Sequence, residues 1–192
     1  MSINLLEKVQ ENLGYPALQK IDPNTEEMVI DVNTPNEDTF SQAAIPAILI
    51  SLFKYSESNE GAKDILSNES DGNWVSKIFN NNSQQVVQTI AAYSKQSNED
   101  PITKMNLIAT EAIKIAKDNL KEADTIEDLK TFFNEEKNNT LLYLPSALHL
   151  GVITNNNTID DSTNKMEGPI SSLMQSIGSI FSNPTTEKSG EN

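Results

Sequence analysis

Two polar side chains near residue 150 have a spacing that suggests nucleophilic chemistry. The single histidine, His149, follows Ser146 by three residues in the segment LPSALHLG. On a helix this spacing places both side chains on one face, where the imidazole could accept the hydroxyl proton. Such catalysis also needs an acid and an oxyanion hole, and the chain lacks a G-x-S-x-G pattern. We therefore interpret His149 as a residue at a helix terminus, where the helix dipole favours its charged form.

Metal-binding patterns are incomplete in this sequence. The absence of cysteine excludes a thiolate site. A carboxylate-bridged di-iron bundle needs two Glu-x-x-His motifs, but the residue three before the only histidine is Ser146. The acidic segment at residues 22–38 does not fit a calcium loop, because neither Asp22 nor Asp31 has Gly at position six and Glu at position twelve. We expect a solvated acidic surface, no metal and no cofactor.

The 28 acidic residues keep one enzymatic alternative open. A hydrolase can work with two carboxyl groups alone, as glycosidases do. It requires that two carboxyl groups converge in a deep pocket and that at least one has a raised pKa. Because that convergence is a property of the tertiary fold, a carboxylate-dependent hydrolase stays an alternative to a non-enzymatic protein.

The overall composition favours a soluble, acidic protein. The 192 residues include 28 Asp or Glu against 14 Lys and no Arg, which gives a formal charge of −14. This charge argues against nucleic-acid binding, since phosphates require cations and base edges favour Arg. The first residues show no secretory signal, and the longest apolar run, Ala43 to Leu52, is too short to cross a bilayer. We therefore expect a cytoplasmic protein.

The elements that must position these residues are predicted to be helices. Apolar residues recur with helical spacing as far as Gly151, and no segment sustains the alternation of a strand. The best strand candidate, EEMVIDV at residues 26–32, is interpreted as an extended connector. We predict an all-α fold, with a compact multi-helix domain of about seven or eight helices over residues 1–153.

Local signals predict several helix boundaries. Gly14 is expected to end the first helix, because it can adopt the left-handed conformation. Thr34 to Glu37 has the pattern of a capping box with Pro35 at the first helical position, and Pro46 should kink the helix that follows. Shorter helices are predicted at residues 60–67, 73–80 and 83–96.

The most regular predicted helix starts at Asp100-Pro101. Its apolar stripe consists of Ile102, Met105, Ala109, Ala112, Ile113, Ala116 and Leu120. Another helix is predicted to start at Thr125 and to turn Leu129, Phe132 and Phe133 inward. The segment LLYLPSALHLG is predicted to form the last core helix, ending at Gly151.

The order of these segments resembles the YidB-like bacterial family of unknown function. In that family an Ala-rich helix with a Pro-Ala-x-Leu step is followed by a Gly and then by an aromatic phrase before a Val-rich helix. The resemblance covers roughly residues 4–120 and implies an all-helical fold without catalytic residues. The matching positions are Pro46, Ala47, Leu49, Gly61, Ile78, Phe79, Val86 and Val87.

The carboxyl-terminal part of the chain is predicted to be a separate unit. Residues 154–167 have the composition of a polar linker, residues 168–182 form an amphipathic helix, and residues 183–192 should be a disordered tail. Residues 168–186 contain no charge. The predicted helix is tethered to the domain, and its apolar stripe consists of Ile170, Leu173, Met174, Ile177, Ile180 and Phe181.

Three surfaces could bury this apolar stripe. The chain's own core could receive it, a protein partner or a second copy of the chain could bind it in a groove, or it could lie on a membrane surface. The acidity of the rest of the chain disfavours anionic lipid. The leading hypothesis is a non-enzymatic interaction or scaffold module that uses the stripe to bind a protein or to self-associate. A membrane-surface sensor and a carboxylate-dependent hydrolase are the alternatives.

Overall fold

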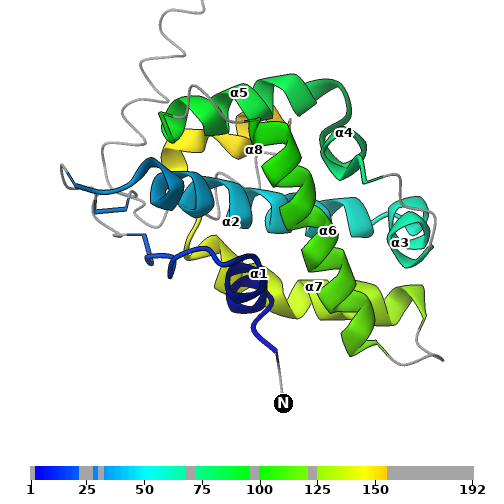
Figure 1. Cartoon of the computed structure of the whole chain (residues 1–192). Coiled ribbons are helices and arrows are strands. Elements are labelled where there is room, and N and C mark those ends of the chain that lie inside the picture. Colours follow the sequence, from blue (N-terminus) through cyan, green and yellow to red (C-terminus); the bar gives the residue numbers. More distant parts are fainter. Residues whose placement is uncertain are drawn as a thin grey trace, which may run out of the picture.

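A computed structural model describes residues 3–21, 28–29, 33–67, 72–95, 100–120 and 125–154. Within these ranges the regular structure is entirely helical, so the all-α prediction is confirmed for the part of the chain described (Figure 1). No helix in these ranges is long and apolar enough to cross a membrane.

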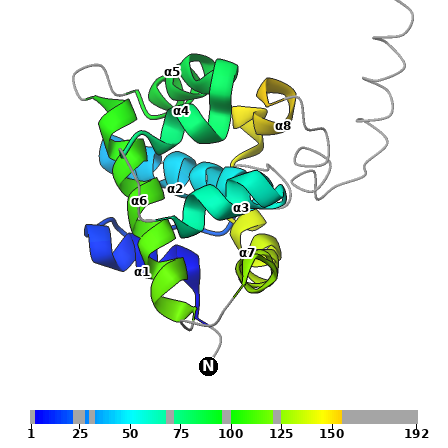
Figure 2. The same cartoon turned by 90° about the vertical axis from the view of Figure 1, so that its right-hand side faces the viewer.

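The fold is organised around α2, which spans Asn36–Ser56. Every position of this helix from residue 39 to residue 53 is buried. A helix that is apolar on all sides requires neighbours on all sides, and α2 contacts α1, α3, α4, α5, α6 and α7. In Figure 2 α2 passes through the middle of the molecule, with α5 and α8 above it and α1 and α7 below it.

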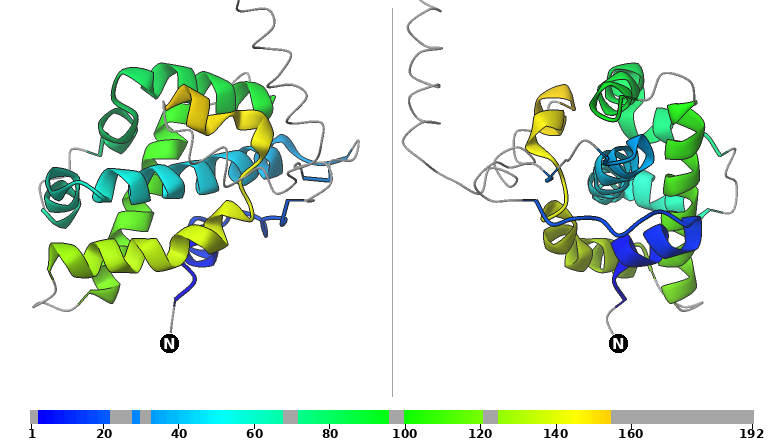
Figure 3. Two further views of the ribbon diagram at one scale, coloured as in Figure 1. Left: turned by 180° about the vertical axis from the view of Figure 1, so that it is seen from behind. Right: turned by 60° about the vertical axis from the view of Figure 1, so that its left-hand side comes forward.

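The other helices surround α2. They are α1 (Leu5–Leu13), α3 (Asn59–Leu66), α4 (Trp74–Phe79), α5 (Ser83–Tyr93), α6 (Pro101–Asn119), α7 (Ile126–Leu141) and α8 (Leu150–Ile153). Two short 3-10 helices, η1 (Asn80–Asn82) and η2 (Ser146–Leu148), precede α5 and α8. Figure 3 shows from behind that α7 and α8 lie on opposite sides of α2.

Several predicted helix ends are confirmed. Gly14 has a φ of 72° and ends α1, because a residue without a Cβ adopts this conformation at little cost. The side chain of Asp100 accepts a hydrogen bond from the N–H of Ile102 at the start of α6. Thr125 and Asp128 form a capping box at the start of α7. These signals act within one helical turn, which is why the sequence alone revealed them.

The predicted start of α2 needs a small correction. Pro35 is the N-cap residue rather than the first helical residue, and the helix begins at Asn36. Pro35 has no side-chain donor or acceptor, whereas the hydroxyl of Thr39 donates to the carbonyl oxygen of Asn36 in the first turn, at 2.9 Å. The helix continues on both sides of Pro46.

The prediction of one helix over LLYLPSALHLG is wrong. The first residue of this segment, Leu141, ends α7, and the chain then turns through Pro145 into η2. Proline lacks an N–H and disfavours helical backbone in the residue before it, so the helix does not continue. His149 has a φ of 44° and separates η2 from α8, which continues past the predicted end at Gly151 to Ile153.

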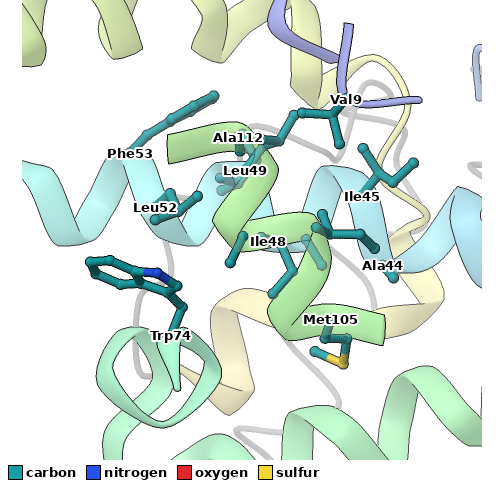
Figure 4. Close-up of a cluster of buried hydrophobic side chains, with 14 of the residues drawn as sticks. Val9, Ala44, Ile45, Ile48, Leu49, Leu52, Phe53, Trp74, Met105 and Ala112 are labelled. Atoms are coloured by element: carbon teal, nitrogen blue, oxygen red, sulfur yellow. The ribbon is translucent and has the colours of Figure 1, made fainter. Parts of the chain in front are cut away.

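The hydrophobic core joins α2 to its neighbours (Figure 4). In this view the Phe53 side chain points away from one side of α2, and Trp74 of α4 lies on the other side. The predicted stripe of α6 is confirmed as apolar packing surface, and two residues outside it, Ile108 and Ile115, are buried as well. They widen the buried face of α6 because this helix contacts α1, α2, α4, α5 and α7. The core members labelled in Figure 4 are Val9, Ala44, Ile45, Ile48, Leu49, Leu52, Phe53, Trp74, Met105 and Ala112.

The buried residue Gln42 links two irregular segments to α2 through hydrogen bonds. The Gln42 amide nitrogen donates to the carbonyl oxygens of Gln19 at 2.9 Å and Tyr143 at 2.7 Å. Its amide oxygen accepts a hydrogen bond from the N–H of Gln19 at 2.8 Å. Next to it, the N–H of Ile21 donates to the carbonyl oxygen of Leu142 at 2.9 Å. Gln42 thereby gives hydrogen-bond partners to backbone groups of Gln19 and Tyr143, which lie at the edge of the core.

Candidate functional site

The stripe that the sequence predicts as a binding surface lies outside the described residues. This applies to Ile170, Leu173, Met174, Ile177, Ile180 and Phe181, to the tail at residues 183–192, and to the linker except Thr154. The candidate sites described below therefore lie on the helices between residues 3 and 154.

Ser146 and His149 do not share a helix face. Ser146 opens η2, and His149 follows this element with left-handed backbone, a φ of 44° and a ψ of 42°. The backbone N–H of His149 donates to the carbonyl oxygen of Ser146 at 2.9 Å. The His149 side chain is exposed. The single helix face on which the spacing predicted both side chains is therefore not formed.

Glu136 is a buried carboxylate that the sequence did not reveal. It lies on α7, is only 6% exposed, and accepts a hydrogen bond from the N–H of Leu5 at 3.0 Å. Burial raises the pKa of Glu136, the bond from Leu5 opposes that rise, and the charges of Glu135 and Glu7 add to it. The carboxylate sits at the first turn of α1, where unpaired backbone N–H groups attract an anion. This contact identifies Glu136 as a structural cap for α1.

Acidic groups do not form a metal cluster in the described ranges. No group of three or more His, Cys, Asp or Glu residues within them has the geometry to hold an ion. The part of the acidic segment that is described includes Met28, which is buried, and Val29, which is 71% exposed.

A cleft lies between the end of α2 and the middle of α7, and we call it the α2–α7 cleft. Its volume is about 280 Å³. Phe53 and Phe133 meet in its lining, with ring centroids 5.2 Å apart and an interplanar angle of 35°. The full lining consists of Phe53, Ser56, Glu57, Lys130, Thr131, Phe133, Asn134 and Lys137.

The two lysines of the α2–α7 cleft differ in their partners. The Lys130 ammonium donates to Oδ1 of Asn59 at 2.7 Å and to Oε1 of Glu127 at 3.0 Å. Within the ranges that the structure describes, Lys137 forms no ion pair and no hydrogen bond through its side chain, although it is only partly exposed. Glu57, the acid of the cleft, pairs with Lys54. Lys137 is therefore the uncommitted charge of this cleft.

A second cleft, of about 220 Å³, lies beside α6 and α4. Its lining consists of Ser67, Trp74, Thr110, Ile113, Lys114, Lys117 and Asp118. The Lys117 ammonium donates to the carbonyl oxygen of Ser67 at 3.0 Å, and Lys114 lies 3.6 Å from Glu111. Because both lysines have protein partners, this cleft offers no uncommitted ammonium of the kind found at Lys137.

A polar cluster beside the second cleft holds α2, α3 and α4 together. The Tyr55 hydroxyl donates to Asp64 at 2.9 Å, and Lys77 lies 3.1 Å from the other oxygen of this carboxylate. The Lys77 ammonium also lies 4.8 Å from the centre of the Trp74 ring. Burial, followed by the hydrogen bond to Asp64, raises the pKa of Tyr55 to about 12. Because each member contacts another, we assign the cluster a structural role.

The sequence carried a weak signal for the α2–α7 cleft. Lys130 and Lys137 are seven residues apart, and Phe133 lies between them, so a helix places all three near one face. The missing information was that this part of α7 packs against the end of α2, which is separated from it by more than 70 residues.

The class of this protein rests on the structure alone. No protein-family model, curated protein sequence or solved structure matches the chain. The described residues define a compact all-α protein with a central buried helix and open clefts on its surface.

Proposed function

We propose that this chain is a non-enzymatic interaction or scaffold module of the cytoplasm, in which residues 168–182 form a tethered amphipathic helix that docks on a protein partner or a second copy. The helical body, of about seven or eight helices at residues 1–153, would carry this helix on the linker at residues 154–167. The proposed contact residues are Ile170, Leu173, Met174, Ile177, Ile180 and Phe181.

One observation carries this proposal: the described helices bury their own apolar faces against one another. The main cluster of buried residues extends in sequence from Leu5 to Leu150. At the centre of this cluster lies α2, which six described helices contact. The stripe predicted at residues 170–181 would add apolar surface to this already extensive core. Burying six such side chains stabilises by roughly 9–18 kcal/mol before the conformational entropy lost on ordering the helix is subtracted. This free energy favours binding of the stripe to another apolar surface.

The distribution of carboxylates supports a binding role over hydrolysis. A carboxylate-dependent hydrolase needs two converging carboxyl groups, one of them with a raised pKa. Each cleft described above contains a single carboxylate, Glu57 or Asp118. Glu136, whose pKa is raised by burial, lines neither of these clefts and caps α1.

We retain membership of the YidB-like family as a proposal. It rests on the Pro-Ala-x-Leu step at residues 46–49 and on the phrase that contains Phe79, Val86 and Val87. Membership of this family would imply that the protein is bacterial, and it would assign no catalytic residue.

The proposed function can be tested with two matched triple variants of the full-length chain. Leu173→Ser, Ile177→Ser and Phe181→Ser remove the apolar stripe, whereas Ser172→Ala, Gln175→Ala and Ser179→Ala alter only the opposite face. Sedimentation velocity measures self-association, and covalent cross-linking followed by mass spectrometry detects other protein partners. We expect the first variant to lose the association and the second to keep it.

Two results would contradict the proposal. If both triple variants kept every cross-link and the same sedimentation behaviour as the unmodified chain, the stripe would not be a protein-binding surface. If only uncharged vesicles with loose lipid packing raised the helicity of the chain, the membrane-surface alternative would replace it.

A further inference from the structure

We propose that the α2–α7 cleft is a binding site for a small aromatic monocarboxylate, held by the Lys137 ammonium above the Phe53 and Phe133 rings. This site is independent of the proposed function of residues 168–182. It uses only described residues, and nothing in the interaction role requires it.

The size and floor of the cleft determine the apolar part of the ligand. Its volume of about 280 Å³ lies just below the range of typical small-molecule sites, which begins near 300 Å³. A single ring with a short chain therefore fits, whereas a larger cofactor does not. Phe53 and Phe133 line the cleft and are held rigidly by the core, since they are 4% and 1% exposed. A ligand meets only a small part of this ring pair, and an aromatic ring packs well against it.

The uncommitted ammonium of Lys137 determines the charge of the ligand. Lys130 already donates to Asn59 and Glu127, but Lys137 has no such partner in the part of the chain that is described. A cation beside an apolar floor is most effective with an anion that can accept a charge-assisted hydrogen bond. The amide of Asn134, one turn before Lys137, lines the same cleft and can donate to the same carboxylate.

The opposite end of the cleft selects against a second negative charge. Phe53 near the end of α2 contacts Phe133, and Asn59 at the start of α3 binds Lys130. Glu57 lies between Phe53 and Asn59 in the chain, so it lies toward the Lys130 end of the cleft. Seven helical residues, or about 10 Å of rise, separate Lys130 from Lys137. A ligand whose carboxylate reaches Lys137 therefore directs its other end toward Glu57. A dicarboxylate would bring its second charge toward this glutamate, so a monocarboxylate is preferred.

The binding test uses 3-phenylpropionate and the full-length chain. Titration calorimetry is expected to show one saturable site for this probe. The neutral amide, 3-phenylpropionamide, and the dicarboxylate phenylsuccinate should each bind about tenfold or more weakly, because one charge-assisted hydrogen bond is lost or one repulsion is added.

Two lysine variants give the matched comparison. Lys137→Met keeps the aliphatic stem and removes the charge, and we expect it to weaken 3-phenylpropionate binding about tenfold or more. Lys8→Met removes an exposed lysine of α1, which does not line the cleft, and should leave the affinity unchanged. Glu57→Gln should restore part of the phenylsuccinate binding.

The unmodified protein provides a readout that does not depend on folding of a variant. On addition of 3-phenylpropionate, the backbone amide resonances of residues 56–57 and 130–137 should shift together, and those of α1 should not. Absence of saturable binding up to about 10 mM would overturn the proposal, since that is weaker than any specific site of this kind. Equal affinities of the Lys137→Met and Lys8→Met variants, or shifts confined to other elements, would overturn it as well.

Discussion

At Gly61, α3 begins so close to the end of α2 that a side chain has no room. A Cβ at this position would lie 2.0 Å from the carbonyl oxygen of Tyr55, which is a backbone atom and cannot swing away. We expect Gly61→Ala to lower the free energy of unfolding by about 1–3 kcal/mol or more, because α3 must shift away from α2. Urea unfolding monitored by circular dichroism measures this change.

The neighbouring exposed position is the control for Gly61. Glu60→Ala changes the same turn of α3 without adding an atom to the contact, and it should cost less than about 1 kcal/mol. Equal losses in the two variants would contradict the steric explanation.

Glu136 gives the fold a pH dependence with a definite sign. Its pKa is raised in the folded state above the ordinary value of 4.5, chiefly by burial. The folded protein therefore binds this proton more tightly than the unfolded chain, and the stabilising contribution of the group is lost as the pH rises through its folded pKa. Glu136→Gln keeps an oxygen that can accept the bond from Leu5 but has no proton to titrate. We expect the variant to gain stability relative to the unmodified protein as the pH rises from 4.5 to 7.

Urea unfolding of both proteins at several pH values tests this sign. The difference between the two free energies of unfolding should grow in favour of the variant with rising pH. A difference that is constant, or that grows in the opposite direction, would show that the Glu136 carboxylate stabilises the fold in its charged form.

At the scale of elements, Gln42 determines how the irregular segments attach to α2. Three of its hydrogen bonds are to backbone atoms of Gln19 and Tyr143. Gln42→Leu would remove three partly buried hydrogen bonds, and each contributes about 0.5–1.5 kcal/mol. We expect a loss of several kcal/mol in the free energy of unfolding, together with faster amide exchange at Gln19.

Gln10 is the matched control for this element. Its side chain accepts a single, partly buried hydrogen bond from the N–H of Leu18 at 3.1 Å. Gln10→Leu should therefore cost about 1 kcal/mol. If this substitution cost as much as Gln42→Leu, the attachment of residues 15–21 and 142–144 would not depend on Gln42.

Some helix ends can be predicted from local sequence signals alone. The ends of α1, α6 and α7 were predictable because a glycine or a capping side chain acts on the nearest turn. The region after Leu141 was mispredicted because its apolar residues continue with helical spacing while Pro145 and the left-handed His149 interrupt the backbone. Hydrophobic spacing reports burial, and burial is possible in 3-10 and irregular segments too.

At the scale of the whole molecule, the core predicts that the helical body folds by itself. Its buried cluster is supplied by α1 to α8 and neighbouring described residues. A chain that ends at Thr154 is expected to unfold in one cooperative transition, with a free energy of unfolding within about 1 kcal/mol of the full-length value. Loss of cooperative unfolding in the shortened chain would show that residues 155–192 complete the core, and the stripe would then be a structural element.

The sequence by itself determined the helical class, the ends of three helices and the apolar face of α6, because each depends on residues within a few turns of one another. It also supplied the stripe at residues 170–181, which stays a prediction. Only the tertiary structure decided that α2 lies at the centre, that Glu136 caps α1, and that Lys137 stands beside Phe53 and Phe133. Glu136 and Leu5 are 131 positions apart, and Lys137 and Phe53 are 84 positions apart. Such contacts form when helices pack, and helical periodicity describes which face packs without specifying its neighbour.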